Sequence, residues 1–303
     1  MNDAYLSAPS YLLGEHDEDH RDIANLAERA AAFQLLPKAA LWGWGRVRRT
    51  DRPLTELAVD TGRQTLGAAG LAPAMVDALV LCSTSITGPA DGHGQFFADV
   101  LTGLGLDDVG FYGITLNRCT NLLAGIDLAT ALVAAGRYRR VLVITTDRVL
   151  DEAERMVSYA LFSDGAASCL ISSEPAGTAY QVLGCANAQQ AGSLVSTAEI
   201  SSELARTVND RLLEPHGMKL GDVCGVMHLN VFLPLVTMKE RQAGYTAEQI
   251  YTGNVTRVGH CYAADPLINL LDRQTHPGHH YLLAASVPGS RFGVLLRKLD
   301  EEG

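Results

Sequence analysis

The chain has 303 residues, of which 47% are hydrophobic and 19% charged, and its formal net charge is −10. This composition fits a globular protein with a large core and argues against intrinsic disorder. The acidic balance argues against nucleic acid as a general partner. Because no apolar run approaches the ~20 residues that span a bilayer, and the N-terminus carries no export signal, we expect no membrane contact. Six single cysteines without metal-ligand spacing indicate a reduced, cytoplasmic protein with no metal site.

Strands and helices are predicted to alternate, which is typical of an α/β protein. Apolar β-favouring runs predict strands at 78–82, 110–116, 141–145, 166–172, 180–186 and 223–229. Helical spacing predicts helices at 54–69, 93–104, 122–135, 200–216, 233–243 and 265–273. Residues 281–296 are expected to form a closing hairpin with Pro288 and Gly289 in its turn. A polar turn near 174–177 predicts two halves, residues 1–175 and 176–303, with a pocket between them.

Cys119 lies where a predicted strand runs directly into a predicted helix. Unpaired backbone N–H groups and the helix dipole at such a junction favour the thiolate over the thiol. A thiolate at the end of a strand is a strong nucleophile that a substrate can reach. The alternative is a small buried apolar residue, which is the usual state of an intracellular cysteine.

Two histidines stand at positions where they could assist such a nucleophile. His228 ends a predicted strand, where it is either catalytic or a core histidine bonded to a backbone carbonyl. His260 follows Gly259 in a turn before a predicted helix, a position more typical of an exposed or functional histidine. The nucleophile hypothesis for Cys119 gains support from both.

Five segments, taken in order and spacing, carry a resemblance to a known family. They are Trp44-Gly-Arg-Val-Arg48, residues 79–85, the helix after Cys119, residues 141–147 and Phe162-Ser-Asp-Gly-Ala166. The chain resembles the thiolase superfamily, most of all 3-oxoacyl-ACP synthase III, the initiating ketosynthase, and its acyltransferase relatives. The resemblance implies a five-layered αβαβα fold of two similar halves and an obligate homodimer. It also implies acyl-CoA or an acyl carrier protein as the substrate donor, with no cofactor.

The same resemblance implies a catalytic set of Cys119, His228 and His260. At the third position the initiating synthases have Asn, whereas Gly259-His260-Cys-Tyr-Ala263 is similar to the motif of elongating ketosynthases. Since Pro288 has no N–H, Gly289 or Ser290 would join the Cys119 N–H in the oxyanion hole. The predicted substrate-binding residues are Trp44, Arg46, Arg48, Arg118 and Asn230.

Several residues depart from the family pattern. Leu229-Asn230-Val231 replaces Gln-Ala-Asn, and the position of a carrier-docking Arg corresponds roughly to Leu233. Arg118 replaces an Ala before the nucleophile; it either favours the thiolate, binds a carboxylate or is a salt-bridged structural residue. These departures suggest a specialised enzyme, and a role in secondary metabolism is our hypothesis.

The expected activity is that of a ketosynthase III-like acyltransferase. An acyl group would load onto Cys119 and then undergo decarboxylative Claisen condensation with a malonyl-type thioester. N–H donors from His228 and His260 would stabilise the enolate, each contributing ~3 kcal/mol. One alternative is acyl transfer to an alcohol or amine, with one histidine as general base and no decarboxylation. A second alternative is a non-catalytic partner subunit of a ketosynthase.

Overall fold

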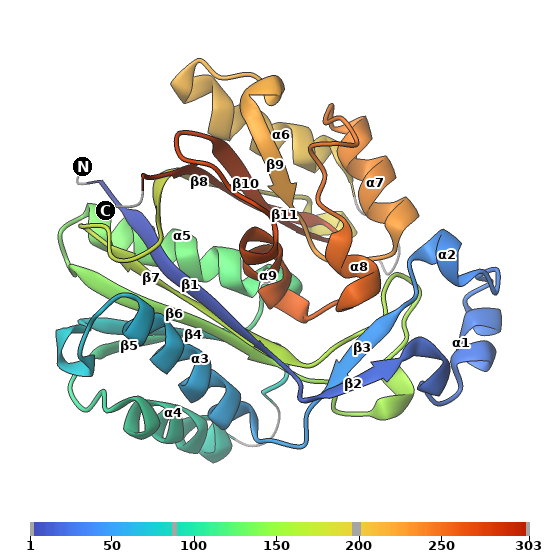
Figure 1. Cartoon of the computed structure of the whole chain (residues 1–303), viewed down its shortest axis with the longest axis horizontal. Helices are drawn as coiled ribbons and strands as arrows, with labels where there is room; N and C mark the ends of the chain where they lie inside the picture. Colours follow the sequence, from blue (N-terminus) through green and yellow to red (C-terminus); the bar gives the residue numbers. More distant parts are fainter. Residues whose placement is uncertain (1–2, 87–89, 196–200, 301–303) are drawn as a thin grey trace.

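The computed structural model describes residues 3–86, 90–195 and 201–300, and Figure 1 shows the course of the chain. A mixed sheet of nine strands has the order β5-β4-β6-β7-β1-β8-β11-β10-β9. Its strands are β1 (Tyr5–Leu13), β4 (Ala78–Cys82), β5 (Gly110–Ile114), β6 (Arg140–Asp147), β7 (Gly165–Ser172), β8 (Ala179–Gln189), β9 (Val223–Met227), β10 (His280–Val287) and β11 (Ser290–Lys298). A separate ribbon pairs β2 (His16–Asp19) with β3 (Arg46–Arg49).

The strands form two groups that meet between β1 and β8. In the first group β4 runs parallel to β5 and β6, and β7 is antiparallel to β6 and β1. In the second group β8, β11 and β10 are antiparallel, and β9 is parallel to β10. Only the start of β1, residues 5–7, pairs with β8, at residues 179–181. The predicted boundary at 175/176 falls in the turn between β7 and β8, and the division into two domains stays a prediction.

The helices form outer and inner layers around these strands (Figure 1). Helix α3 packs on β7, β1 and β6 and is covered by α4, whereas α6 packs on β8 and β11. Helices α5 and α9 each contact strands of both groups. The helices are α1 (Leu26–Ala32), α2 (Ala39–Trp42), α3 (Leu54–Ala68), α4 (Ala90–Leu104), α5 (Asn121–Ala134), α6 (Ser202–Leu213), α7 (Leu233–Gln242), α8 (Gly253–Arg257) and α9 (Asp265–Asp272).

Helix α5 lies between the two strand groups because it is apolar on several faces. Leu122, Ile126 and Val133 are almost fully buried. A Cβ at Gly125 would lie 2.8 Å from the Cys82 sulfur, so the glycine permits the helix to approach β4 closely. An all-round apolar helix is typical of an inner layer, where both sides face a sheet.

The predicted α/β class and the order of the predicted elements are confirmed. The hairpin of β10 and β11 turns at Pro288 and Gly289, as expected. The helix predicted from residue 200 begins outside the described residues, and α6 ends at Leu213, where a short 3-10 turn follows. No helix within the described residues is long and apolar enough to cross a membrane.

Candidate active site

A cavity of about 510 Å³ lies between the two strand groups, within the size range of small-molecule sites. Its wall is lined by Thr84, Arg118, Cys119, Ser158, Tyr159, Phe162, Leu229, Val231, Leu235, Met238, Lys239, Gln242, His260, Tyr262, Ser286, Val287 and Pro288. Neither Asp nor Glu is among these lining residues, whereas three basic side chains are. An apolar cavity with few polar groups fits an acyl chain and a thioester.

Cys119 lies in the one-turn 3-10 segment Arg118–Thr120 that leads directly into α5, and it is 8% exposed. The strand-to-helix junction expected for this residue is therefore present. The preceding Arg118 has φ +54°, a left-handed conformation that non-glycine residues rarely adopt. Its guanidinium Nη2 donates to the Pro288 carbonyl oxygen at 2.7 Å, not to an acid. This bond ties the turn that carries Cys119 to the β10–β11 hairpin.

His260 lines the same cavity as Cys119 and is held by an acid. Its Nδ1 lies 2.5 Å from Asp265 Oδ2, and its buried Nε2 has no hydrogen-bond partner among the described residues. Cys119 lies close enough to affect the pKa of the imidazole. Burial alone would lower the pKa of His260, but the charges of Asp265 and Cys119 raise it to about 10. An imidazolium beside Cys119 stabilises a thiolate, as in other Cys–His pairs.

Asp265, which the sequence reasoning missed, is the acid that orients His260. Its two carboxylate oxygens also accept the Asn230 N–H at 2.6 Å, the Asn230 Nδ2 at 3.2 Å and the Cys261 N–H at 2.8 Å. Asp265 is the first residue of α9 and is fully buried. Asn230, predicted to bind substrate, is therefore placed behind Asp265 and does not line the cavity. Cys119, His260 and Asp265 thus bring a thiol, an imidazole and a carboxylate into one region of the structure.

The Phe162-Ser-Asp-Gly motif fixes the backbone of His260. The His260 N–H donates to Leu161 O at 2.8 Å, and the Ser163 N–H donates to His260 O at 2.9 Å. The Phe162 ring lies 4.8 Å from the imidazole, centroid to centroid. Gly259 has φ +79°, and a Cβ there would lie 3.0 Å from Leu161 O, so the turn into His260 requires glycine.

His228 is buried in the same region but does not line the cavity. Burial and the nearby Lys239 charge lower its pKa, so the imidazole is neutral. Its Nδ1 lies 3.2 Å from Leu229 O, which accepts an N–H, and its Nε2 contacts Lys239 Nζ. In this tautomer Nε2 is an acceptor from Lys239. Lys239 therefore stands between His228 and the cavity.

Lys239 belongs to a buried charged cluster that the sequence did not reveal. Its Nζ lies 2.9 Å from Glu240 Oε1, and Arg291 Nη1 lies 2.6 Å from the same oxygen. Burial, together with the Arg291 charge, lowers the pKa of Lys239 to about 7 despite the attraction of Glu240. No local pattern marks this burial, because Lys239 and Glu240 are followed by Arg241 and Gln242, as on a solvated helix end.

Replacing Glu240 by Gln is expected to lower the free energy of unfolding by about 3–5 kcal/mol, because two buried cations lose their counterion. Denaturant titration of wild type and variant measures this difference. Glu56→Gln is the matched control, since Glu56 is 55% exposed in its ion pair with Arg52, and a surface pair contributes ~1 kcal/mol or less. Equal losses in both variants would contradict a stabilising role for the buried cluster.

The remaining predicted site residues lie elsewhere. Trp44 is buried against Phe232, with ring centroids 6.1 Å apart. Arg46 and Arg48 in β3 both pair with Asp17 of β2, at 2.6 Å and 3.0 Å. None of these three residues lines the cavity, nor do Gly289 and Ser290. Their roles in substrate binding and in the oxyanion hole stay predictions.

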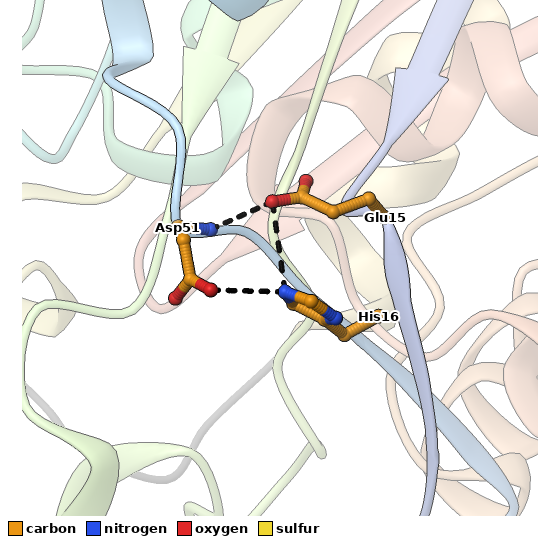
Figure 2. A group of neighbouring side chains, drawn as sticks. All are labelled: Glu15, His16 and Asp51. Carbon is orange, nitrogen blue, oxygen red and sulfur yellow. Dashed lines mark hydrogen bonds and ion pairs between the residues drawn. The ribbon is translucent and has the colours of Figure 1, made fainter.

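Figure 2 shows a group of exposed side chains, Glu15, His16 and Asp51, beside the β2–β3 ribbon. His16 Nε2 lies 3.0 Å from Asp51 Oδ2 and 3.8 Å from Glu15 Oε1. Exposed acidic groups of this kind are common without an ion. The group is a surface ion-pair cluster, and none of its residues lines the cavity.

In sequence, the chain matches known proteins over part of its length. The family model for 3-oxoacyl-[acyl-carrier-protein] synthase III matches residues 115–190. The β-ketoacyl-[acyl-carrier-protein] synthase III of Helicobacter hepaticus is 28% identical over 125 residues, and that of Synechocystis sp. is 31% identical over 121 residues. Each match covers 39% of this chain but only 36% and 35% of the relative, so the chain spans about a third of these relatives' length.

Solved structures match over nearly the whole chain. The acyltransferase ChlB3 has a TM-score of 0.84 at 18% identity, covering 99% of this chain and 98% of its own. The 3-oxoacyl-(acyl carrier protein) synthase III of Pseudomonas aeruginosa PAO1 has a TM-score of 0.79 at 19% identity, covering 99% and 100%. The thiolase-like α/β fold predicted from the sequence is therefore confirmed. In sequence as well as in fold, the chain is similar to 3-oxoacyl-[acyl-carrier-protein] synthase III.

Proposed function

We propose that this protein is an acyl-thioester-dependent condensing enzyme that carries its acyl group on Cys119. The observation that carries the proposal is that Cys119 and His260 line one cavity with no acidic side chain in its lining, and that Asp265 holds Nδ1 of His260 and so leaves Nε2 unpartnered. An acyl-CoA or acyl carrier protein would deliver the acyl group. The sequence matches to β-ketoacyl synthases III support condensation as the second step.

The geometry supports a first step of thioester exchange. The Cys119 thiolate attacks the thioester carbonyl carbon, a new C–S bond forms, and the bond to the carrier sulfur breaks. The departing carrier thiolate takes the proton held on His260 Nε2. Because Asp265 holds Nδ1–H, the imidazole remains in the tautomer that can accept a proton again at Nε2.

In the second step, a malonyl-type thioester loses carbon dioxide and leaves an enolate. The enolate carbon attacks the acyl carbon on Cys119, the C–S bond breaks, and a 3-oxoacyl thioester leaves while the thiolate is restored. The apolar cavity wall, with Phe162, Leu229 and Val231, favours the release of a neutral molecule from a carboxylate.

A second candidate is transfer of the acyl group to an alcohol or amine. Two observations favour it: the Cys119–His260–Asp265 series resembles the triads that activate such acceptors, and His228 turns its Nε2 toward Lys239. In that reaction His260 removes the acceptor's proton as general base. The homodimer that the family resemblance implies stays a prediction.

Intact-mass spectrometry with acyl thioesters and a carboxyl-labelled malonyl thioester separates these functions. We expect an acyl adduct on Cys119 and loss of the labelled carbon dioxide. An adduct without label loss favours the alcohol or amine acceptor, which is then tested by adding such acceptors. The absence of any adduct across donors of short and medium chain length would contradict the proposed enzyme class.

A further inference from the structure

The hydroxyl of Ser286, near the end of β10, is contacted by two buried cations. Lys239 Nζ donates to Ser286 Oγ at 3.0 Å, and Arg291 Nη1 donates to the same oxygen at 3.0 Å. Ser286 is 4% exposed and lines the cavity that also holds Cys119 and His260. A hairpin strand can form without a serine at this position. The two charged contacts of the Ser286 hydroxyl therefore point to a role in the cavity.

A serine hydroxyl has two acceptor sites and one hydrogen to donate. Both acceptor sites of Ser286 are occupied by charged N–H donors, so its hydrogen must point elsewhere. Among the described residues, no acceptor receives it. Charge-assisted donors also polarise the hydroxyl and make it a stronger donor itself. Ser286 is therefore prepared to donate to an oxygen that enters the cavity.

Glu240 holds both cations in position for this task. Its carboxylate accepts from Arg291 at 2.6 Å and 3.2 Å, and Lys239 lies 2.9 Å away. In its ammonium form, Lys239 directs its three hydrogens to His228, Glu240 and Ser286. Lys239 lines the cavity too but then has no hydrogen left for a substrate, so Ser286 is the group of this cluster that can donate to one.

The backbone of the β10–β11 turn offers the cavity no N–H donor from Pro288, Gly289 or Ser290. Pro288 lines the cavity but has no N–H, and Gly289 and Ser290 do not line it. The bond from Arg118 to Pro288 O joins this hairpin to the turn that carries Cys119. Ser286 and Cys119 therefore belong to linked parts of one wall.

We propose that the Ser286 hydroxyl donates a hydrogen bond to the thioester carbonyl oxygen while Cys119 attacks the carbonyl carbon. This inference rests on the proposed function and names a further catalytic residue for it. As the C–S bond forms, the carbonyl π electrons move onto the oxygen, where the Ser286 hydrogen bond stabilises the negative charge. When the carbonyl reforms, the carrier thiolate leaves with the proton from His260. Ser286 keeps its own proton throughout.

Rapid-quench mass spectrometry of Cys119 acylation tests this role. Ser286→Ala is expected to acylate about 100-fold more slowly than wild type, the typical effect of losing one oxyanion donor. Ser286→Thr keeps the hydroxyl and is expected to retain most of the rate. Ser168→Ala is the matched control, because it removes a buried serine hydroxyl in β7 that bonds Thr61 and Thr65 and does not line the cavity.

The outcomes separate this inference from the proposed function. A wild-type protein that forms no adduct contradicts the proposed function itself. Wild-type acylation together with an equal rate in Ser286→Ala overturns the inference alone. If Ser286→Ala does not fold, Lys239→Met decides: it keeps the hydroxyl but removes one polarising cation, and its acylation should be slower than wild type. An unchanged rate in that variant also overturns the inference.

Discussion

Cys119→Ala is expected to abolish acyl-enzyme formation with every thioester donor. The thiolate is the group that forms the covalent bond, and alanine offers no replacement. The substitution removes one sulfur from a residue that is 8% exposed, so the fold should persist. Intact-mass measurement after incubation with acyl thioesters, and steady-state turnover, provide the two readouts.

Cys169→Ala is the matched control for this experiment. Cys169 is fully buried in β7, where burial raises the pKa of its thiol, and it does not line the cavity. This variant is expected to keep both the adduct and the turnover. If turnover persisted at the wild-type rate in Cys119→Ala, catalysis would have to proceed without the covalent intermediate.

Local sequence patterns predicted the strand-to-helix turn that carries Cys119, because the pattern and the turn have the same cause. An apolar β-favouring run followed at once by a helical run forces a sharp turn, and Cys119 occupies that turn. Gly259 likewise indicated the turn before His260, because glycine readily adopts the left-handed backbone that the structure has there. Such signals depend on a few consecutive residues, so the sequence carries them directly.

The charged partners depend on contacts between distant segments, and the sequence did not reveal them. Lys239 on α7 is indistinguishable by pattern from a solvated lysine; it is buried because β10 and β11 supply Ser286 and Arg291. The tautomer of His228 follows from that same contact. The β2–β3 ribbon was missed for another reason: His16–Asp19 and Arg46–Arg49 pair opposite charges and lack the apolar alternation of a strand.

Asp265→Asn is expected to lower the rate of acyl transfer by about 10⁴-fold, as in other nucleophile–base–acid series. The carboxylate accepts N–H bonds from His260, Cys261 and Asn230. An amide in its place presents an NH₂ group to at least one of these donors. The imidazole then loses the partner that fixes its tautomer.

The pH dependence of this variant gives a second readout with a definite sign. In the wild type, burial lowers the pKa of His260, but the Asp265 charge raises it to about 10, so the imidazolium persists at neutral pH. Without that charge the pKa of His260 falls, because burial is then opposed by Cys119 alone. A smaller fraction of His260 is then the imidazolium that stabilises the thiolate. Residual acylation should therefore increase as the pH rises, whereas wild-type acylation should change little between pH 7 and 9.

Asp272→Asn is the matched control, because it makes the same chemical change at the other end of α9. Asp272 accepts from Tyr11 at 2.8 Å and from Asn254 at 2.8 Å, and it does not line the cavity. Its loss removes hydrogen bonds and an ion pair with Arg257, so it should lower thermal stability while leaving the acylation rate and its pH profile unchanged. If Asp265→Asn behaved like this control, Asp265 would be a structural acid, and the Cys119–His260 pair would act without an orienting carboxylate.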